Sequence, residues 1–461
     1  MILSLFTLLT AKFLTVTNEY MWLTPLPPTK YTSKNRPFLA TTVQGAEQSM
    51  SSHQPLRYRW IILALLTMIS TFVAAIPASC MPVLFKEIAE DLGLSLVQVG
   101  TIWGFTSLAG IFVSLVSGIL GDRFGVKLII GVASLLVGIT GALRGLASSF
   151  LMLAFLVFLN GVVRLILPIN ATKTIGIWFR GQHLGVAMGI SAMGMGLGLM
   201  LGPLISASIL SPLLGGWRNV MFFYGGISVV VGVLWFIFGK ELHDSGTTMA
   251  NPSRKTIPFK QVFSRLIKLK ALWLIGLTIL FRSASIMGTT GYLPMYLRNQ
   301  GWATAAADGT LSVFYAASTL AVVPLSLVSD RLGSRKAILL PAIILTMVSI
   351  GILPFVNESA IWILVILAGI TMDGFMAIAV TLLLETEGVG QANSGTALGM
   401  VFTIAQFGSV VSPPLGNSLA RFNPGLPFVF WAALSIIAVI TLLLARETRR
   451  KGFAADLQKA Q

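Results

Sequence analysis

Residues 118–127, Gly118-Ile-Leu-Gly-Asp122-Arg123-Phe-Gly125-Val-Lys127, form a short charged turn between two long apolar runs. A related stretch, Ser326-Leu-Val-Ser-Asp330-Arg331-Leu-Gly333-Ser-Arg335, occurs 208 residues later. Aspartate, arginine, glycine and a final base occupy the same places in both stretches. A charged turn that recurs between apolar segments predicts a chain built from two similar halves.

The composition is typical of a membrane protein. Of the 461 residues, 55% are hydrophobic and only 10% are charged, and the mean hydropathy is +0.85. In a soluble protein, the net charge of +16 would favour nucleic acid as a partner. Here the bases lie in short loops between apolar runs, so we expect no nucleic-acid partner.

Twelve apolar runs are long enough to cross a bilayer, which needs about 20 residues per helix. We therefore predict an all-α membrane protein with twelve transmembrane helices in two pseudo-symmetric six-helix bundles. The helices are expected at 58–80, 97–120, 127–146, 150–172, 183–209, 218–239, 271–296, 308–328, 336–356, 360–384, 393–417 and 426–446. The predicted domains are an N-terminal extension (1–57), the first bundle (58–239), a cytoplasmic linker (240–270), the second bundle (271–446) and a cytoplasmic tail (447–461).

The extension differs from the rest of the chain, because a short apolar start is followed by a Pro-rich polar stretch. The apolar piece is too short to span a bilayer, and it lacks the basic flank of a signal peptide. We expect residues 1–57 to be disordered or to precede the natural start, for which Met50 is the candidate.

The loop charges predict the orientation of the chain. Twenty-one lysines and arginines fall on the side that carries the linker and both ends of the helical region, against five on the other side. The five are Lys86, Arg144, Arg218, Arg298 and Arg421. Because basic loops stay in the cytoplasm, this asymmetry predicts a cell-membrane protein with both termini cytoplasmic.

Residues typical of metal, redox or catalytic sites are scarce. Cys80 is the one cysteine, and the three histidines fall in predicted loops without ligand-like spacing. A phosphate-binding Lys-Ser loop and a nucleophile elbow are both missing from the sequence. We therefore expect no metal, no cofactor and no enzymatic activity.

These features together resemble the major facilitator superfamily of secondary transporters, over residues 58–446. Gly216-Trp217-Arg218 at the start of helix six is a further point of similarity. Within the superfamily, the segments from Pro168 to Ala171 and from Ile177 to Arg180 look like the organic anion to cation symporters and the cyanate permease group. The resemblance implies that the two charged turns latch the halves on the cytoplasmic side when the transporter faces outward. The expected gating residues are Gly118, Asp122, Arg123, Gly125, Lys127, Asp330, Arg331, Gly333 and Arg335.

Helix five carries a stripe of small residues, Gly194, Gly198 and Gly202, followed by Pro203. Glycine at intervals of four lets two helices pack closely, so a packing role is predicted. The same stretch resembles a helix-five motif associated with antiporters of the superfamily, although packing alone also explains it.

Three ionisable residues fall near the middles of apolar runs: Arg164 in helix four, Arg282 in helix seven and Asp373 in helix ten. A charge at the bilayer centre costs about 2.5–3.5 kcal/mol, so these side chains should face a polar interior. The resemblance adds that helices one, four, seven and ten surround the central cavity. Subtracting the repeat offset from Asp373 gives position 165, which places Asp373 and Arg164 in nearly equivalent positions of the two halves.

Two cations and one carboxylate favour an anionic substrate, because arginine presents a planar fork to carboxylate or phosphate oxygens. We expect Arg164, Arg282 and Asn170 to bind the substrate, and Asp373 to couple transport to protons. A buried pair in which Asp373 only neutralises one arginine is the structural alternative.

The sequence thus predicts proton-coupled import of a small organic anion by alternating access. Its expected partners are the anionic solute, protons and membrane lipid, with a functional monomer. One alternative is a proton-driven efflux antiporter for amphipathic or drug-like compounds. Another is a transporter-like receptor that does not transport its ligand.

Overall fold

The computed structural model describes residues 58–179, 182–241 and 259–445. The predicted extension 1–57, with Met50, and the predicted tail 447–461 lie outside the described residues. Every regular element of the described part is a helix, and twelve helical segments are long and apolar enough to cross a membrane. The prediction of an all-α chain with twelve membrane-spanning helices is therefore confirmed.

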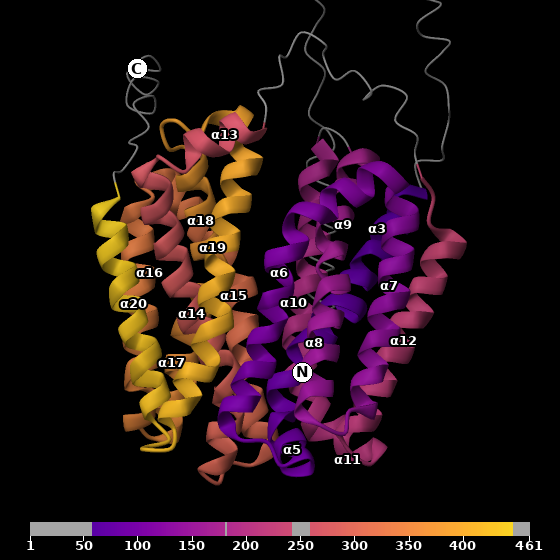
Figure 1. The fold of residues 1–461 in the computed structure, drawn as a ribbon, viewed down its shortest axis with the longest axis vertical. Coiled ribbons are helices and arrows are strands. Elements are labelled where there is room, and N and C mark those ends of the chain that lie inside the picture. Colours follow the sequence, from indigo (N-terminus) through magenta and orange to yellow (C-terminus); the bar gives the residue numbers. More distant parts are fainter. Residues whose placement is uncertain (1–57, 180–181, 242–258, 446–461) are drawn as a thin grey trace, which may run out of the picture. The chain divides into compact units, whose positions relative to one another are not determined.

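The first six spans lie between Tyr58 and Phe238, and the helix α5 lies between the first and the second of them (Figure 1). Several are built from two or three consecutive helical pieces. The elements are α3 (Tyr58–Met68), η2 (Ile69–Ala75), α4 (Ile76–Ser79), α5 (Met81–Leu92), α6 (Leu96–Phe124), α7 (Val126–Leu143), η3 (Arg144–Leu146), α8 (Phe150–Arg164), α9 (Ile166–Trp178), α10 (Gln182–Ile205), η4 (Ser206–Leu210), α11 (Ser211–Leu214) and α12 (Trp217–Phe238).

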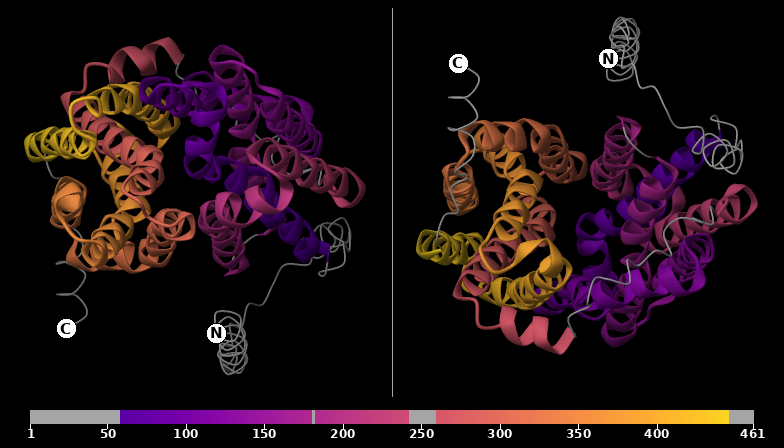
Figure 2. Two further views of the ribbon diagram at one scale, coloured as in Figure 1. Left: turned by 90° about the horizontal axis from the view of Figure 1, so that it is seen from below. Right: turned by 90° about the horizontal axis from the view of Figure 1, so that it is seen from above.

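The second six spans lie between Lys270 and Leu444 and follow a short linker helix. The elements are α13 (Phe259–Leu266), α14 (Lys270–Asn299), α15 (Thr304–Leu332), α16 (Lys336–Ile352), η5 (Leu353–Phe355), α17 (Glu358–Ile370), α18 (Met372–Leu384), α19 (Gly390–Leu419) and α20 (Leu426–Leu444). Figure 2 shows the indigo-to-magenta helices of the first half on one side and the rose-to-yellow helices of the second half on the other.

The helical bundle has two ends, which we call the linker face and the opposite face. The linker face carries the turn between α6 and α7, the turn between α15 and α16, and the starts of α13 and α14. The opposite face carries α5, α11 and the turns at Gly301 and Gly425. Polar contacts between the halves occur toward the opposite face: the Asn417 amide donates to the Leu96 carbonyl at 2.9 Å, and Trp103 Nε1 donates to the Met287 carbonyl at 2.8 Å.

Helices α6 and α19 pack closely in this region, and small residues make the approach possible. A Cβ atom added to Gly100 would lie 2.7 Å from the Pro413 carbonyl oxygen, and one on Gly104 would lie 2.4 Å from that of Val410. Real Cβ atoms do not approach backbone that closely, so glycine is required at both positions.

The predicted boundaries of helix one agree with the structure, whereas those of helix four differ from it, and a helix outside the twelve predicted ones is present. A further helix, α5, follows the first span after a turn at Cys80, and prolines at the second positions of α4 and α5 suit such short helix starts. Helix four extends to Trp178, beyond the predicted end at 172, because the polar residues Lys173 and Thr174 continue the helix instead of ending it.

Candidate functional site

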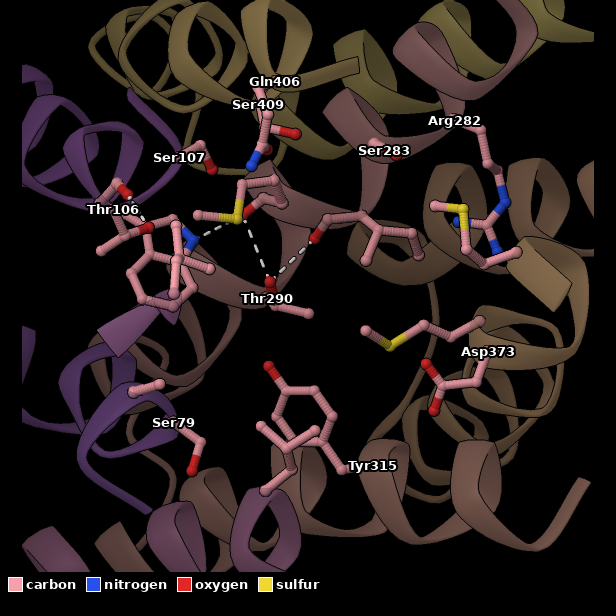
Figure 3. A pocket seen from close by; sticks show the side chains of 18 of the residues that line it. Ser79, Thr106, Ser107, Arg282, Ser283, Thr290, Tyr315, Asp373, Gln406 and Ser409 are labelled. Atoms are coloured by element: carbon pink, nitrogen blue, oxygen red, sulfur yellow. Dashed lines mark hydrogen bonds between the residues drawn. The ribbon is translucent and has the colours of Figure 1, made fainter. Parts of the chain in front are cut away.

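A central cavity of about 340 Å³ lies between the two halves. Its lining contains Arg164, Arg282 and Asp373, the three intramembrane charges that the sequence singles out. The structure therefore brings these three residues together, as Figure 3 shows in part. The other polar side chains of the lining are Ser79, Thr106, Ser107, Ser283, Thr290, Tyr315, Gln406 and Ser409.

Arg282 is held at one side of this cavity by helix ten. Its Nη2 donates to the Thr371 hydroxyl at 3.0 Å, and its guanidinium carbon lies 5.3 Å from the centre of the Phe375 ring. Only 3% of the residue is exposed, and its Nε is buried without a hydrogen-bond partner among the described residues. The guanidinium is thus oriented but not neutralised by a direct ion pair, since no described carboxylate lies within 4.0 Å of it.

Asp373 is held on the same side of the cavity by Ser318 of α15. The Ser318 hydroxyl donates to Asp373 Oδ2 at 2.6 Å and accepts from the Asp373 backbone N–H at 3.1 Å. Asp373 also lies in the first turn of α18, where the helix dipole favours a negative charge. Asp373 interacts electrostatically with Arg282, and Figure 3 shows the two side chains on one side of the cavity.

Helices four and ten are both interrupted beside these charges. The first break is at Leu165, between α8 and α9, and the second is at Thr371, between α17 and α18. Pro168 has no N–H to donate to the carbonyl of Arg164 four residues earlier, which accounts for the first break. At the second break, Ser318 accepts the backbone N–H of Asp373 that would otherwise continue the helix. Interrupted helices at a midplane site are a recurring feature of secondary transporters.

Arg164 is the last residue of α8, where a cation is favoured by the helix dipole. It lines the central cavity from the first half, whereas Arg282 and Asp373 line it from the second. No described carboxylate lies within 4.0 Å of its guanidinium. Arg164 is the last residue before the break at Leu165, and Asp373 is the second residue after the break at Thr371, so a helix break lies beside each of the two residues.

Asn170 does not line the central cavity with the three charges. It is fully buried in α9, and its amide donates to the Ile166 carbonyl at 2.9 Å and to the Ser117 carbonyl and hydroxyl at 3.3 Å. A Cβ atom on Gly121 would lie 1.8 Å from Asn170 Oδ1, so Asn170 packs against α6 near the linker face. In this structure, its contacts are those of a side chain that joins two helices.

The first charged turn lies between α6 and α7, within the first half. Gly125 has a φ of +83°, which favours glycine, and the Val126 N–H donates to Glu241 Oε1 at 3.2 Å. Arg123 is exposed above the Phe124 ring, and the Lys127 carbonyl accepts from Trp235. Gly118 and Asp122 belong to α6, but their side-chain surroundings lie outside the described part.

The second charged turn lies between α15 and α16, within the second half. Arg335 bonds Asp330 at 2.6 Å and Glu385 at 2.9 Å, and these carboxylates, Glu385 first, raise the pKa of Arg335. Gly333 has a φ of +63° at the end of α15, and Arg331 is exposed. In this conformation, the contacts that the structure describes for both turns are made to the turn's own half.

The glycine stripe of helix five packs against helix one. A Cβ atom on Gly198 would lie 2.5 Å from Ala75 Cβ, and one on Gly202 would lie 2.1 Å from the Ser79 hydroxyl. The Thr71 hydroxyl donates to the Gly194 carbonyl at 2.8 Å. Pro203 lies inside α10, shortly before the π-helical turn η4.

Two arginines that the sequence places in loops are buried. Arg144 is 3% exposed and lines a small cavity together with Arg164 of helix four. Arg298 is 8% exposed. Arg298 Nη2 donates to both oxygens of the fully buried Asp308, at 2.6 and 2.5 Å. In the sequence, both arginines count only among the charges of one side, and their burial was not predicted, because the end of an apolar run does not reveal the direction in which a long side chain turns.

The cavity residues of helices two, eight and eleven were also missed by sequence reasoning. Trp103, Tyr315 and Gln406 contribute to the lining although none carries a formal charge. Their only sequence signal is a polar atom inside an apolar run, which many membrane helices share. No group of three or more His, Cys, Asp or Glu side chains able to hold a metal ion occurs within the ranges that the structure describes.

The family model of the Major Facilitator Superfamily matches residues 63–384 and 301–460 of the chain. The chain is 22% identical over 465 residues to the 4-hydroxybenzoate transporter PcaK of Pseudomonas aeruginosa, covering 91% of this chain and 99% of that protein. It is 25% identical over 397 residues to the probable nitrate/nitrite antiporter NarK1 of Thermus thermophilus, covering 78% and 85%. Over 254 residues it is 25% identical to the probable sulfoacetate transporter SauU of Cupriavidus necator, a match that covers 53% of this chain and only 58% of that protein.

Solved structures show the same fold at low sequence identity. A bacterial homolog of the human lysosomal transporter Spinster, in an inward-facing and unoccupied conformation, superposes with a TM-score of 0.66 at 17% identity, covering 86% of this chain and 96% of that one. The nucleoside transporter NupG superposes with a TM-score of 0.68 at 14% identity, covering 83% and 98%.

Proposed function

We propose that this chain, which belongs to the Major Facilitator Superfamily, imports a small organic anion together with protons. The proposal rests on the buried guanidinium of Arg282, which borders the central cavity. Its Nε has no hydrogen-bond partner, and no carboxylate lies within 4.0 Å of it, among the described residues. A buried cation of this kind is costly unless an anion completes its environment. PcaK is named as a transporter of 4-hydroxybenzoate, SauU of sulfoacetate and NarK1 of nitrate and nitrite, all of which are anions.

Substrate binding is assigned to Arg282 and Arg164, which approach the cavity from opposite halves. One acidic group on the substrate engages Arg282, whose orientation is set by Thr371 and Phe375. Arg164 attracts the same anion from the first half. A ligand that contacts both halves stabilises the closed intermediate of alternating access, because it is bound best when the halves approach.

Proton coupling is assigned to Asp373. An anion bound at Arg282 brings a second negative charge close to this carboxylate, and the two charges repel each other at low dielectric. Protonation of Asp373 removes the repulsion, so binding of the anion and binding of the proton favour each other. Release of both on the linker face then resets the carrier.

The conformation can be assigned once the orientation predicted by the basic loops is adopted. With the linker face in the cytoplasm, the described contacts between the halves lie toward the outer side, and we assign the structure to an inward-facing state. The tight packing of α6 against α19 forms the closed outer gate in this state.

Uptake into vesicles containing the purified chain tests the proposal. The panel consists of labelled aromatic and aliphatic monocarboxylates, dicarboxylates, sulfonates, nitrate and an uncharged sugar, each with and without an inward proton gradient. We expect accumulation of an organic anion that the gradient increases and a protonophore abolishes. Uptake of none of the anions, with proton-driven extrusion of a cationic dye, would replace the proposal by efflux.

A further inference from the structure

A second, smaller cavity lies inside the first half, next to the central one. Its volume is about 30 Å³, and its lining includes Arg144, Arg164, Asn160, Val157 and Met81. Arg164 borders both cavities, whereas Arg144 borders only the smaller one. About 10–15 Å³ is enough to hold a water molecule, so this space accepts a single small ion but no organic acid.

Arg144 is directed into this space by local geometry. It begins η3 at the end of helix three, and its Nε donates to the Gly141 carbonyl at 3.3 Å. This is the one hydrogen bond that its guanidinium makes with the described residues. The two terminal nitrogens therefore have unused donors in a residue that is 3% exposed.

Negative charge is missing around the two arginines. Among the residues that the structure describes, no aspartate or glutamate lies within 4.0 Å of either guanidinium. The ionisable group that acts on both is Cys80, and burial raises the pKa of its thiol to about 11, so it is neutral at physiological pH. The Asn160 amide, another polar group of the lining, donates to the Val137 carbonyl and to the Thr140 hydroxyl, both at 3.0 Å.

Two like charges that interact in a buried space are unfavourable without a counter-charge. In the second half, Arg298 is also buried, but it forms an ion pair with Asp308 at 2.5 Å. In the first half, no acidic group among the residues that the structure describes pairs with Arg144 or Arg164.

We propose that the cavity between Arg144 and Arg164 binds one small monovalent anion of chloride size, distinct from the transported organic anion. The ion accepts hydrogen bonds from both guanidiniums and offsets their repulsion. The bound ion also lowers the positive electrostatic potential that Arg164 contributes to the central cavity. It therefore changes the affinity for substrate without occupying the substrate position. This inference concerns a different cavity from the proposed transport site and does not depend on which substrate is carried.

The test uses the purified full chain in detergent or lipid nanodiscs, with chloride as the probe and gluconate as the matched anion at equal ionic strength. We expect binding of one ³⁶Cl⁻ per chain that saturates, and an unfolding midpoint about 2 °C higher in chloride than in gluconate. Bromide should replace chloride, since its charge is the same and its size is similar. Absence of saturable binding would overturn the proposal and leave a water-filled cavity.

Two variants locate the site. Arg144→Gln removes one of the two cations, and Val157→Met fills the cavity without changing a charge. Both should lose ³⁶Cl⁻ binding and the chloride-dependent shift, while Arg421→Gln, an exposed arginine on the opposite face, should retain both. Chloride binding that survives in Arg144→Gln and Val157→Met places the ion elsewhere and refutes the assignment.

A third variant separates this inference from the proposed transport function. Arg282→Lys should lose organic-anion uptake and keep ³⁶Cl⁻ binding unchanged. Loss of chloride binding in Arg282→Lys would show that chloride occupies the central cavity instead. If Arg144→Gln does not fold, the Val157→Met variant and the stoichiometry of the unmodified chain decide the question.

Discussion

Arg282 Nη2 lies 3.0 Å from the Thr371 hydroxyl, at the residue where helix ten is interrupted between α17 and α18. The same hydroxyl donates to the Ala368 carbonyl at 2.8 Å and lies 2.7 Å from the Thr346 hydroxyl. A break in one helix therefore supplies the acceptor that orients the buried cation of another. This relationship connects the interruption of helix ten to the recognition of an anion.

Replacement of Arg282 by lysine should weaken substrate binding roughly 30- to 100-fold, because a point charge cannot form the paired hydrogen bonds of a guanidinium. Equilibrium binding of the substrate identified by the uptake panel is the measurement. Arg331→Lys, an exposed arginine on the linker face, is the control and should bind normally. Unchanged affinity in Arg282→Lys would remove this residue from the binding site.

Thr371→Val should reduce substrate affinity about tenfold, since the nearly isosteric valine leaves Arg282 Nη2 without its acceptor. Thr371→Ser keeps the hydroxyl and should behave like the unmodified chain. The dissociation constants of the two variants are compared directly. Equal losses in both would mean that the methyl group matters and the hydrogen bond does not.

Asp373→Asn should abolish the effect of a proton gradient on uptake but allow exchange of labelled for unlabelled substrate across the membrane. The reason is that an amide keeps the shape of the side chain but cannot carry the proton. Glu358→Gln, at an exposed position of α17, is the matched acid-to-amide control. Gradient-driven accumulation by Asp373→Asn would assign the coupling to another group.

Pro168→Ala should straighten helix four, because alanine restores an N–H that can bond the Arg164 carbonyl. We expect a higher unfolding midpoint together with an uptake rate lowered severalfold, since Arg164 loses its place at a helix end. Pro427→Ala is the control, because this proline lies in the first turn of α20, where no intrahelical bond is lost. Faster uptake in Pro168→Ala would contradict a functional role for the break.

Stability near the opposite face should depend on pH through Glu87 of α5. Burial raises the pKa of Glu87 above its ordinary value of 4.5, although the Ser211 hydroxyl, 2.5 Å from Oε2, opposes the shift. The folded chain therefore binds more protons than the unfolded chain above pH 4.5, and stability rises as the pH falls from neutral toward that value. Glu87→Gln should flatten this dependence and raise the unfolding midpoint at pH 7.5 by roughly 1–3 °C.

The control for Glu87 is Glu90→Gln, an exposed residue on the same helix. Unfolding midpoints of both variants are recorded from pH 5 to 8. A slope in Glu87→Gln equal to that of the unmodified chain would show that Glu87 does not cause the dependence.

The architecture could be predicted because it depends on local properties of the chain. A run of about 20 apolar residues forms a helix in a bilayer, because a helix satisfies the backbone hydrogen bonds within the segment itself. The recurrence of the charged turn at Asp122 and Asp330 indicates the duplication, and the cost of intramembrane charge singles out Arg164, Arg282 and Asp373.

What the sequence could not determine is where each of these side chains turns and what it contacts. In the sequence, Asn170 and the three charged residues are all polar residues inside apolar runs. In the structure, Asn170 donates hydrogen bonds to Ser117 of the neighbouring helix and does not line the central cavity. Arg144 and Arg298 both look like loop bases, yet both are buried and only Arg298 is paired with an acid among the described residues.

The sequence by itself thus determined the twelve helices, their twofold repetition and the identity of the charges near the middle of the membrane, because hydrophobicity and charge act residue by residue. Only the tertiary structure decided which charges share a cavity, which are neutralised and which helices break beside them. Those properties depend on distances between residues far apart in the chain, such as Ser318 and Asp373, and such distances are set by helix packing.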